Sequence, residues 1–121
     1  MTSRALRSAS DLVAAGLVTA EDARDLAPVI RAYPLAIPAP VAALIDVTDP
    51  DDPIARQYVP DTRELAVTTS EHDDPIGDTR HMPVQGIVHR YTDRALLKVV
   101  HACPVYCRFC FRREMVGPGK E

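Results

Sequence analysis

Three cysteines fall within eight residues near the end of the chain, Cys103, Cys107 and Cys110, in the spacing C-x3-C-x2-C. Cysteine thiolates are the usual ligands of iron–sulfur clusters, and three of them on a four-iron cluster leave one iron without a protein ligand. That iron can bind a small molecule directly, which favours chemistry on a substrate over electron transfer alone. The spacing therefore predicts a metal centre in this loop, with an iron–sulfur cluster as the favoured occupant.

Two other interpretations of the cysteines stay open on spacing alone. Zinc in a structural site takes four ligands, and His89 or His101 could supply the fourth beside the three thiolates. Three unligated cysteines are the remaining interpretation. Although histidine titrates near neutrality, His81, His89 and His101 are expected to be structural, and none of them is assigned to catalysis.

Charged residues are divided unevenly along the chain. Residues 49–74 hold eight acids and two arginines, a local charge of −6, whereas residues 80–121 hold eight Lys or Arg and three acids, a local charge of +5. A basic surface attracts anionic small molecules such as carboxylates and phosphates. Arg112 and Arg113 follow the last cysteine, and the planar fork of Arg pairs with carboxylates. The basic end is therefore predicted to bind anions, with a solvated charged surface as the alternative.

The composition is typical of a soluble globular domain with a modest core. Of the 121 residues, 46% are hydrophobic and 26% charged, and the net charge of −3 favours neither nucleic acid nor an anionic membrane as a partner. No stretch holds the ~20 consecutive apolar residues of a membrane span. Arg4, Arg7 and Asp11 interrupt any signal-peptide pattern. Closely spaced cysteines without signs of secretion indicate a reducing compartment, so the cytoplasm is the predicted location.

Three regions are predicted along the chain: residues 1–47 as helical, residues 48–94 as an irregular arm, and residues 95–121 as the start of an α/β domain. Seven of the 11 prolines lie between Pro28 and Pro60, which keeps regular elements there short. Residues 95–102 are the best strand candidate, because they are apolar and partly β-branched, and they end directly before Cys103.

Helix boundaries are predicted from capping residues. Ser8 or Ser10 is predicted to cap a short helix through Ala15, which Gly16 stops, and Thr19 with an acid three residues later indicates a second helix start. Pro28 should kink or shorten that second helix, which Tyr33-Pro34 ends. A further short helix is expected over residues 41–45.

The cysteine loop and its surroundings resemble a known family. C-x3-C-x-aromatic-C, with Phe109 in the aromatic place, is similar to the signature of the radical S-adenosylmethionine (SAM) enzymes. Residues 74–78, 89–94 and 107–113 resemble the lysine 2,3-aminomutase family, in a match that is dense from about residue 46 to residue 117. Thr92 is a departure, since the family usually has Pro there, and Thr keeps a backbone N–H and a free φ.

The resemblance implies a fold, a set of cofactors and a reaction. The fold would be α/β, with N-terminal helices and a Pro-rich arm leading into the first strand and cluster loop of a radical-SAM partial (β/α) barrel. The cofactors would be a 4Fe-4S cluster, S-adenosyl-L-methionine and pyridoxal 5′-phosphate (PLP). The reaction would be that of an isomerase, which moves the α-amino group of L-lysine to give β-lysine in a homo-oligomeric parent enzyme.

Site residues are implied in the same way. The cluster ligands would be Cys103, Cys107 and Cys110, and Tyr106 and Phe109 would lie beside the cluster and SAM. Arg90 and Arg94 would lie near the PLP phosphate, and Arg112 would bind the substrate's α-carboxylate. No catalytic residue is assigned, and neither Lys98 nor Lys120 matches a PLP-binding lysine.

The length of the chain sets a further expectation. Only 11 residues follow Cys110, whereas a full barrel needs on the order of 200 residues or more. Most of the barrel would therefore be absent, and we expect an N-terminal fragment of an aminomutase that is inactive alone. A stand-alone iron–sulfur or zinc-binding module and a non-catalytic fragment that packs on a partner remain open. Lysine, glutamate and other amino acids also remain open as substrates.

Overall fold

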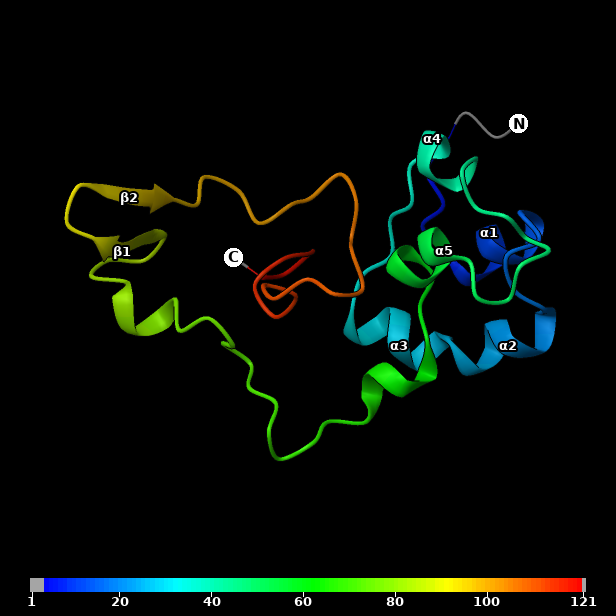
Figure 1. The fold of residues 1–121 in the computed structure, drawn as a ribbon, viewed down its shortest axis with the longest axis horizontal. Coiled ribbons are helices and arrows are strands. Elements are labelled where there is room, and N and C mark those ends of the chain that lie inside the picture. The colour runs from blue at the N-terminus through cyan, green and yellow to red at the C-terminus, as the bar shows by residue number, and fades with distance from the viewer. Residues whose placement is uncertain (1–3, 121) are drawn as a thin grey trace. The chain divides into compact units, whose positions relative to one another are not determined.

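The computed structural model describes residues 4–120, which form two units. The helical unit comprises the described residues up to Val67 together with Cys103–Cys110. The hairpin unit comprises Thr68–Ala102 and the described residues from Phe111 onward. Figure 1 labels the helices of the first unit and the two strands of the second.

Short capped helices build the first half of the helical unit. Helix α1 spans Ala9–Ala14, with Ser8 as its N-cap, and α2 spans Ala20–Asp25, with Thr19 as its N-cap (Figure 1). Each cap is a capping box with an aspartate three residues later, Asp11 or Asp22. The cap hydroxyl accepts from the N–H of that aspartate, and the carboxylate of the aspartate accepts from the N–H of the cap residue. Gly16 follows α1 at φ +72°, a conformation that glycine adopts without steric cost. These predicted helix starts and this helix end are confirmed.

Prolines divide the rest of the unit into short elements, as predicted. Helix α3 spans Ala27–Ala32, with Pro28 in its first turn, and it ends at Tyr33 before Pro34. Helix α4 spans Ala39–Ala42, so it begins two residues earlier than the predicted helix over 41–45 and ends three residues sooner. Pro40 lies in its first turn, where the missing N–H of proline costs nothing. Helix α5 (Pro53–Tyr58) and the 3-10 helix η1 (Thr62–Leu65) follow.

A small apolar core joins these helices. Leu6 and Ile37 pair through two backbone hydrogen bonds of 2.9 and 3.0 Å, which bring the start of the chain to the segment after α3. The core side chains are each at most 5% exposed: Leu6, Leu12, Leu26, Val29, Leu35 and Ile37. The helices are only four to six residues long. Packing on this core, rather than helix propensity, therefore has to hold them.

Removing one cap should weaken the helical unit measurably. The Thr19 hydroxyl accepts from Asp22 N–H at 3.1 Å, and replacing a capping Thr by Ala costs about 1 kcal/mol. We expect Thr19→Ala to lower the free energy of unfolding in urea by that amount. Thr62→Ala is the control, because this exposed threonine is not the N-cap of a helix among residues 4–120. Equal destabilisation by both variants would contradict the capping assignment.

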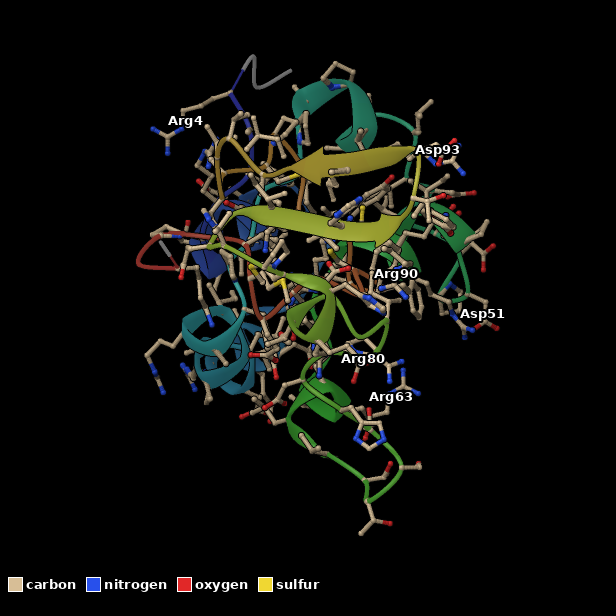
Figure 2. The ribbon with its side chains drawn as sticks, turned by 90° about the vertical axis from the view of Figure 1, so that its left-hand side faces the viewer. Arg4, Asp51, Arg63, Arg80, Arg90 and Asp93 are labelled. Atoms are coloured by element: carbon tan, nitrogen blue, oxygen red, sulfur yellow. The ribbon has the colours of Figure 1, made fainter. Side chains whose placement is uncertain are left out.

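The hairpin unit contains two antiparallel strands. Strand β1 (Ile87–Tyr91) pairs with β2 (Arg94–Leu97), with Ile87 opposite Leu97 and Val88 opposite Leu96. Thr92 and Asp93 form the turn, and Figure 2 shows the two strands side by side with Asp93 at the turn end. A register irregularity falls between Val88 and Tyr91, at His89 and Arg90. The 3-10 helix η2 (Thr79–His81) precedes the hairpin.

The predicted strand over residues 95–102 is correct only in its first part. Strand β2 ends at Leu97, so the predicted strand is wrong for residues 98–102, and Val99 and Val100 are 76% and 66% exposed. The physical reason is the length of the partner strand. Lys98 N–H still bonds Gly86 O at 2.7 Å, but β1 begins only at Ile87, so the residues after Lys98 have no strand opposite them in the described chain.

No helix within residues 4–120 is long and apolar enough to cross a bilayer.

Candidate functional site: a cysteine loop and an arginine pocket

The cysteine loop, residues 103–110, belongs to the helical unit and contains no helix or strand. All three cysteines are free thiols; Cys103 and Cys110 are half-buried and Cys107 is exposed. Cys110 N–H donates to Cys107 O at 3.3 Å, which turns the chain between the last two thiols. Within residues 4–120, no group of three or more His, Cys, Asp or Glu side chains is gathered closely enough to hold a metal ion.

Arg108 anchors this loop from between the last two cysteines. Its side chain is 5% exposed, and its Nε and Nη2 donate to Glu64 Oε1 and Oε2 at 3.0 and 2.7 Å. Its Nη1 donates to Pro34 O at 3.0 Å, and its backbone N–H donates to Gln57 O at 2.7 Å. One arginine therefore bonds the segment after α3, helix α5 and η1.

Glu64 is itself held in place for this contact. Its Oε1 accepts from Asp61 N–H at 3.0 Å and closes a capping box at the start of η1. A second backbone bond to the loop runs from Tyr106 N–H to Ala36 O at 3.2 Å. The loop is thus fixed on either side of Cys107, while the Phe109 ring is 75% exposed. Neither Arg108 nor Glu64 is a predicted site residue, because no local sequence pattern indicates a pairing across 44 residues.

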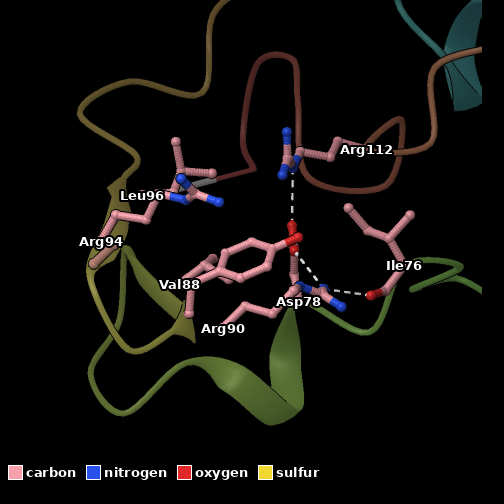
Figure 3. Close-up of a pocket in the computed structure, with 9 residues that line it drawn as sticks. Ile76, Asp78, Val88, Arg90, Arg94, Leu96 and Arg112 are labelled. Atoms are coloured by element: carbon pink, nitrogen blue, oxygen red, sulfur yellow. Dashed lines mark hydrogen bonds and ion pairs between the residues drawn. The ribbon is translucent and has the colours of Figure 1, made fainter.

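The three arginines with implied anion contacts lie in one pocket of the hairpin unit (Figure 3). This arginine pocket has a volume of about 520 Å³ and is lined by Asp78, Val88, Arg90, Arg94, Leu96 and Arg112, among others. Arg90 comes from β1, Arg94 from β2, and Arg112 from the segment that follows the cysteine loop. Three guanidinium groups against one carboxylate give the pocket a positive charge, which suits it to anions.

Asp78 holds two of these arginines. Its side chain is 2% exposed, and Arg112 Nε donates to its Oδ2 at 2.8 Å while Arg90 Nη2 lies 3.4 Å from its Oδ1. Arg90 Nη2 also donates to the Ile76 carbonyl. Figure 3 shows these contacts converging on one side of the pocket. Asp78 lies in one of the segments that resemble the family, but it is not a predicted site residue, because its pairing with Arg112 spans 34 residues.

Arg94 is placed differently from the other two. Its side chain is 68% exposed, and its guanidinium lies over the Tyr91 ring, with 4.6 Å from Cζ to the ring centroid. A cation over an aromatic face is attracted by the ring quadrupole. The Asp93 carboxylate, at the exposed turn, lies 3.8 Å from Arg94 Nη1. Arg94 can therefore swing toward an anion more freely than Arg90 or Arg112.

The turn before η2 fixes the backbone of Asp78. Asp74 Oδ1 accepts from Asp78 N–H and its Oδ2 from Thr79 N–H, both at 2.8 Å. The hydrogen bond from Thr79 N–H, with smaller contributions from the Thr79 hydroxyl, Asp78 and Gly77, lowers the pKa of Asp74 below its ordinary value. Gly77 adopts φ +70° inside this turn, a conformation that glycine tolerates best.

Asp74 should make the stability of the hairpin unit depend on pH. Because its pKa is depressed in the folded state, its contribution is complete above the unfolded pKa of about 4 and is lost as the pH falls through the lower folded pKa. We expect Asp74→Asn to destabilise the chain at pH 6 and the difference from wild type to shrink as the pH falls below about 4. Urea unfolding at pH 6 and at a series of pH values below about 4 measures this difference in stability.

Asp73→Asn is the matched control for that series, because it removes an exposed carboxylate one residue away. We expect this variant to stay close to wild type in stability at every pH. A difference between wild type and Asp74→Asn that is independent of pH would contradict the assigned role of the Asp74 carboxylate.

The candidate zinc ligands are placed as follows. His101 Nδ1 lies 2.8 Å from Met115 O, and His101 O accepts from Gly117 N–H at 2.8 Å. His101 therefore connects the segment after β2 to the last described segment. His89 is exposed at the register irregularity of β1. His101 therefore has a structural partner in the Met115 carbonyl.

Comparison with known proteins supplies the family. No protein-family model matches the chain. It is 36% identical over 104 residues to the L-lysine 2,3-aminomutase of Clostridium subterminale, covering 86% of this chain and 25% of that protein. The L-lysine 2,3-aminomutase of Acetoanaerobium sticklandii is 44% identical over 75 residues, 62% of this chain and 18% of that protein.

A third relative covers almost the whole chain. The L-lysine 2,3-aminomutase of Fusobacterium nucleatum is 31% identical over 116 residues, 96% of this chain and 27% of that protein. The chain thus spans about a fifth to a quarter of the length of these curated relatives. Since several relatives with the same name match along most of the chain, the chain belongs to the lysine 2,3-aminomutase family.

Proposed function

We propose that the chain is the N-terminal part of a radical SAM amino-acid 2,3-aminomutase that converts L-lysine to β-lysine. The observation that carries this proposal is the identity of 31–44% to proteins named L-lysine 2,3-aminomutase. Because the chain spans only 18–27% of those relatives, the complete activity is proposed for a longer polypeptide. We also propose that the complete polypeptide forms a radical-SAM partial (β/α) barrel and that the segment containing β2 lies near its beginning. Free thiols suit a reducing compartment such as the cytoplasm.

The cysteine loop fits an iron–sulfur cluster in its donor set. Three free thiols lie on one loop without regular structure, and thiolates are the donors that such clusters take. Cys103, Cys107 and Cys110 would hold the cluster, which would supply the electron that cleaves SAM. The thiols are not gathered in the described structure, so metal binding would have to draw them together, as binding and folding are coupled at many metal sites.

The loop residues between the cysteines would shape the surroundings of the cluster. Tyr106 is half-buried and held by its backbone bond to Ala36, so it can exclude water from one side of the loop. Phe109 exposes three quarters of its surface, which suits an aromatic contact with the adenine of SAM. Arg108 would keep both residues in place through its bonds to Glu64 and Pro34.

The arginine pocket would bind the anionic groups of cofactor and substrate. Arg90 and Arg94 would bind the phosphate of PLP, and Arg112 would pair with the α-carboxylate of the amino acid. PLP would supply the carbonyl chemistry that holds the substrate's amino group. Neither lysine is proposed to bind PLP: Lys98 Nζ lies 3.7 Å from Met115 Sδ, and Lys120 pairs with Glu114 at 3.8 Å.

A second candidate function is a non-catalytic chain that packs on a partner protein. The observation that favours it is a group of exposed apolar side chains at the end of β2 and directly after it, with Leu97, Val99 and Val100 each more than 60% exposed. A stand-alone iron–sulfur or zinc-binding module is a third candidate, which rests on the cysteine loop alone.

Anaerobic reconstitution with iron, sulfide and a reductant tests the cluster proposal. We expect a brown protein with about four irons and four sulfides per chain, as for a 4Fe-4S cluster. A colourless protein that binds one zinc and no iron under these conditions would contradict the proposal and favour the zinc-binding module.

A further inference from the structure

We propose that Asp78 is a positioning residue that holds Arg90 and Arg112 in the arginine pocket in the orientation needed to bind anionic groups. The inference rests on the proposed anion-binding role of this pocket and adds a residue to it. Asp78 would act through the two arginines, without touching the bound anion itself.

The burial of Asp78 is the first observation. It is 1% exposed, the most deeply buried charged residue described in the hairpin unit, whereas Arg90 and Arg112 side chains are 30% and 31% exposed. A buried carboxylate is stable only with charged or hydrogen-bonding partners, and these two arginines are its partners. Asp78 also lines the pocket, but its buried carboxylate is engaged by the two arginines, whose side chains are the more exposed groups.

The hydrogen-bond geometry is the second observation. Asp78 bonds Arg112 through Nε, and Arg90 through one terminal nitrogen that also bonds the Ile76 carbonyl. A guanidinium carries five N–H donors, so these bonds leave donors on both arginines for a phosphate or a carboxylate. Figure 3 shows the two side chains meeting Asp78 from different elements.

The fixed backbone of Asp78 is the third observation. Asp74 accepts from the N–H groups of both Asp78 and Thr79 at 2.8 Å, which sets the start of η2. A carboxylate on a fixed turn restrains two long and otherwise flexible side chains before any ligand arrives. Such preorganisation lowers the entropy lost on binding, and the carboxylate also offsets the repulsion between the two like charges.

A simpler role for Asp78 predicts the opposite result. If Asp78 were only a neutralising charge, its removal would make the pocket more positive and would tighten the binding of anions. If Asp78 positions the arginines, its removal weakens binding although the pocket gains net positive charge. The sign of the change therefore separates the two roles.

The test compares Asp78→Asn with the control Asp93→Asn in the full chain. Both variants remove one negative charge, but Asp93 is exposed at the hairpin turn and pairs only loosely with Arg94 at 3.8 Å. Titration with inorganic phosphate and then with PLP, followed by NMR, measures affinity. We expect Asp78→Asn to weaken both by about tenfold or more, the scale of a lost charge-assisted contact, and Asp93→Asn to leave affinity equal or slightly higher.

A measurement on the wild-type chain covers the case in which Asp78→Asn does not fold. We expect the Nε–H signal of Arg112 to exchange slowly with water and to remain protected when phosphate saturates the pocket, because Asp78 keeps that bond. Loss of protection on adding phosphate would overturn the inference. If folded Asp78→Asn binds the anions as tightly as wild type or more tightly, the positioning role of Asp78 is wrong while the proposed anion site stands. If the wild-type chain binds neither anion, the proposed anion site is wrong as well.

Discussion

Replacing Arg108 by methionine is expected to destabilise the helical unit by about 3–5 kcal/mol, the cost of breaking a buried ion pair by removing one partner. Arg108 is 5% exposed and Glu64 12% exposed, and the pair shares two hydrogen bonds of 3.0 and 2.7 Å. Without Arg108, the Glu64 carboxylate and the Pro34 carbonyl would lose these partners in a poorly hydrated place. Urea unfolding measures the effect, and faster alkylation of Cys107 and Cys110 should accompany it.

Two further variants make this prediction specific. Arg63→Met removes an arginine from the same part of the chain, but its side chain is 86% exposed in its pair with Asp61, so we expect little change. Arg108→Met combined with Glu64→Gln removes the unpaired carboxylate while an amide oxygen remains to accept from Asp61 N–H. We expect this double variant to be more stable than Arg108→Met alone. Equal effects of Arg63→Met and Arg108→Met would contradict the anchoring role.

Single replacement of Cys103, Cys107 or Cys110 by alanine is expected to abolish the stable 4Fe-4S cluster of the reconstituted chain. The proposed site has three thiolates and needs all of them. A cluster with only two protein ligands would lose iron during desalting. The visible absorption and the iron content after gel filtration measure this loss.

The control for the cysteine series is His101→Ala, since His101 is a candidate ligand only for zinc and already bonds Met115 O through its ring. We expect His101→Ala to retain the iron content of the wild type, although the segment around Met115 should loosen. A cysteine variant that keeps the full iron content would show that its thiol is not a cluster ligand.

Local features of the fold could be predicted from the sequence because their causes are local. Ser8 and Thr19 each precede an acid by three residues, and both form the capping boxes that this spacing favours. Pro28 and Pro40 fall in first turns of helices, where proline is tolerated. These boundaries depend on a few neighbouring residues, so the sequence contains the necessary information.

Features that depend on distant partners could not be predicted. The strand over residues 95–102 fails after Leu97 because its extent is set by β1, which was not predicted. The burial of Arg108 runs against the usual exposure of arginine and requires Glu64, 44 residues earlier. The gathering of Arg90, Arg94 and Arg112 in one pocket likewise depends on the hairpin and on Asp78.

The candidate site residues themselves came from residue types and from resemblance to the family. The structure brings the three arginines to a common pocket and anchors the cysteine loop between its thiols. It does not gather the three thiols into a ligand group among the described residues. Their roles as cluster ligands and anion contacts therefore stay predictions, which the experiments above address.

The central claim is that three cysteines hold a cluster whose remaining iron binds SAM. Electron paramagnetic resonance of the reconstituted and reduced chain, recorded with and without SAM, tests it most directly. The proposal predicts that SAM changes the spectrum of the reduced cluster, and that the Cys103→Ala chain gives neither the signal nor the change. A cluster signal that SAM leaves unaltered would contradict the claim and would favour an electron-transfer module.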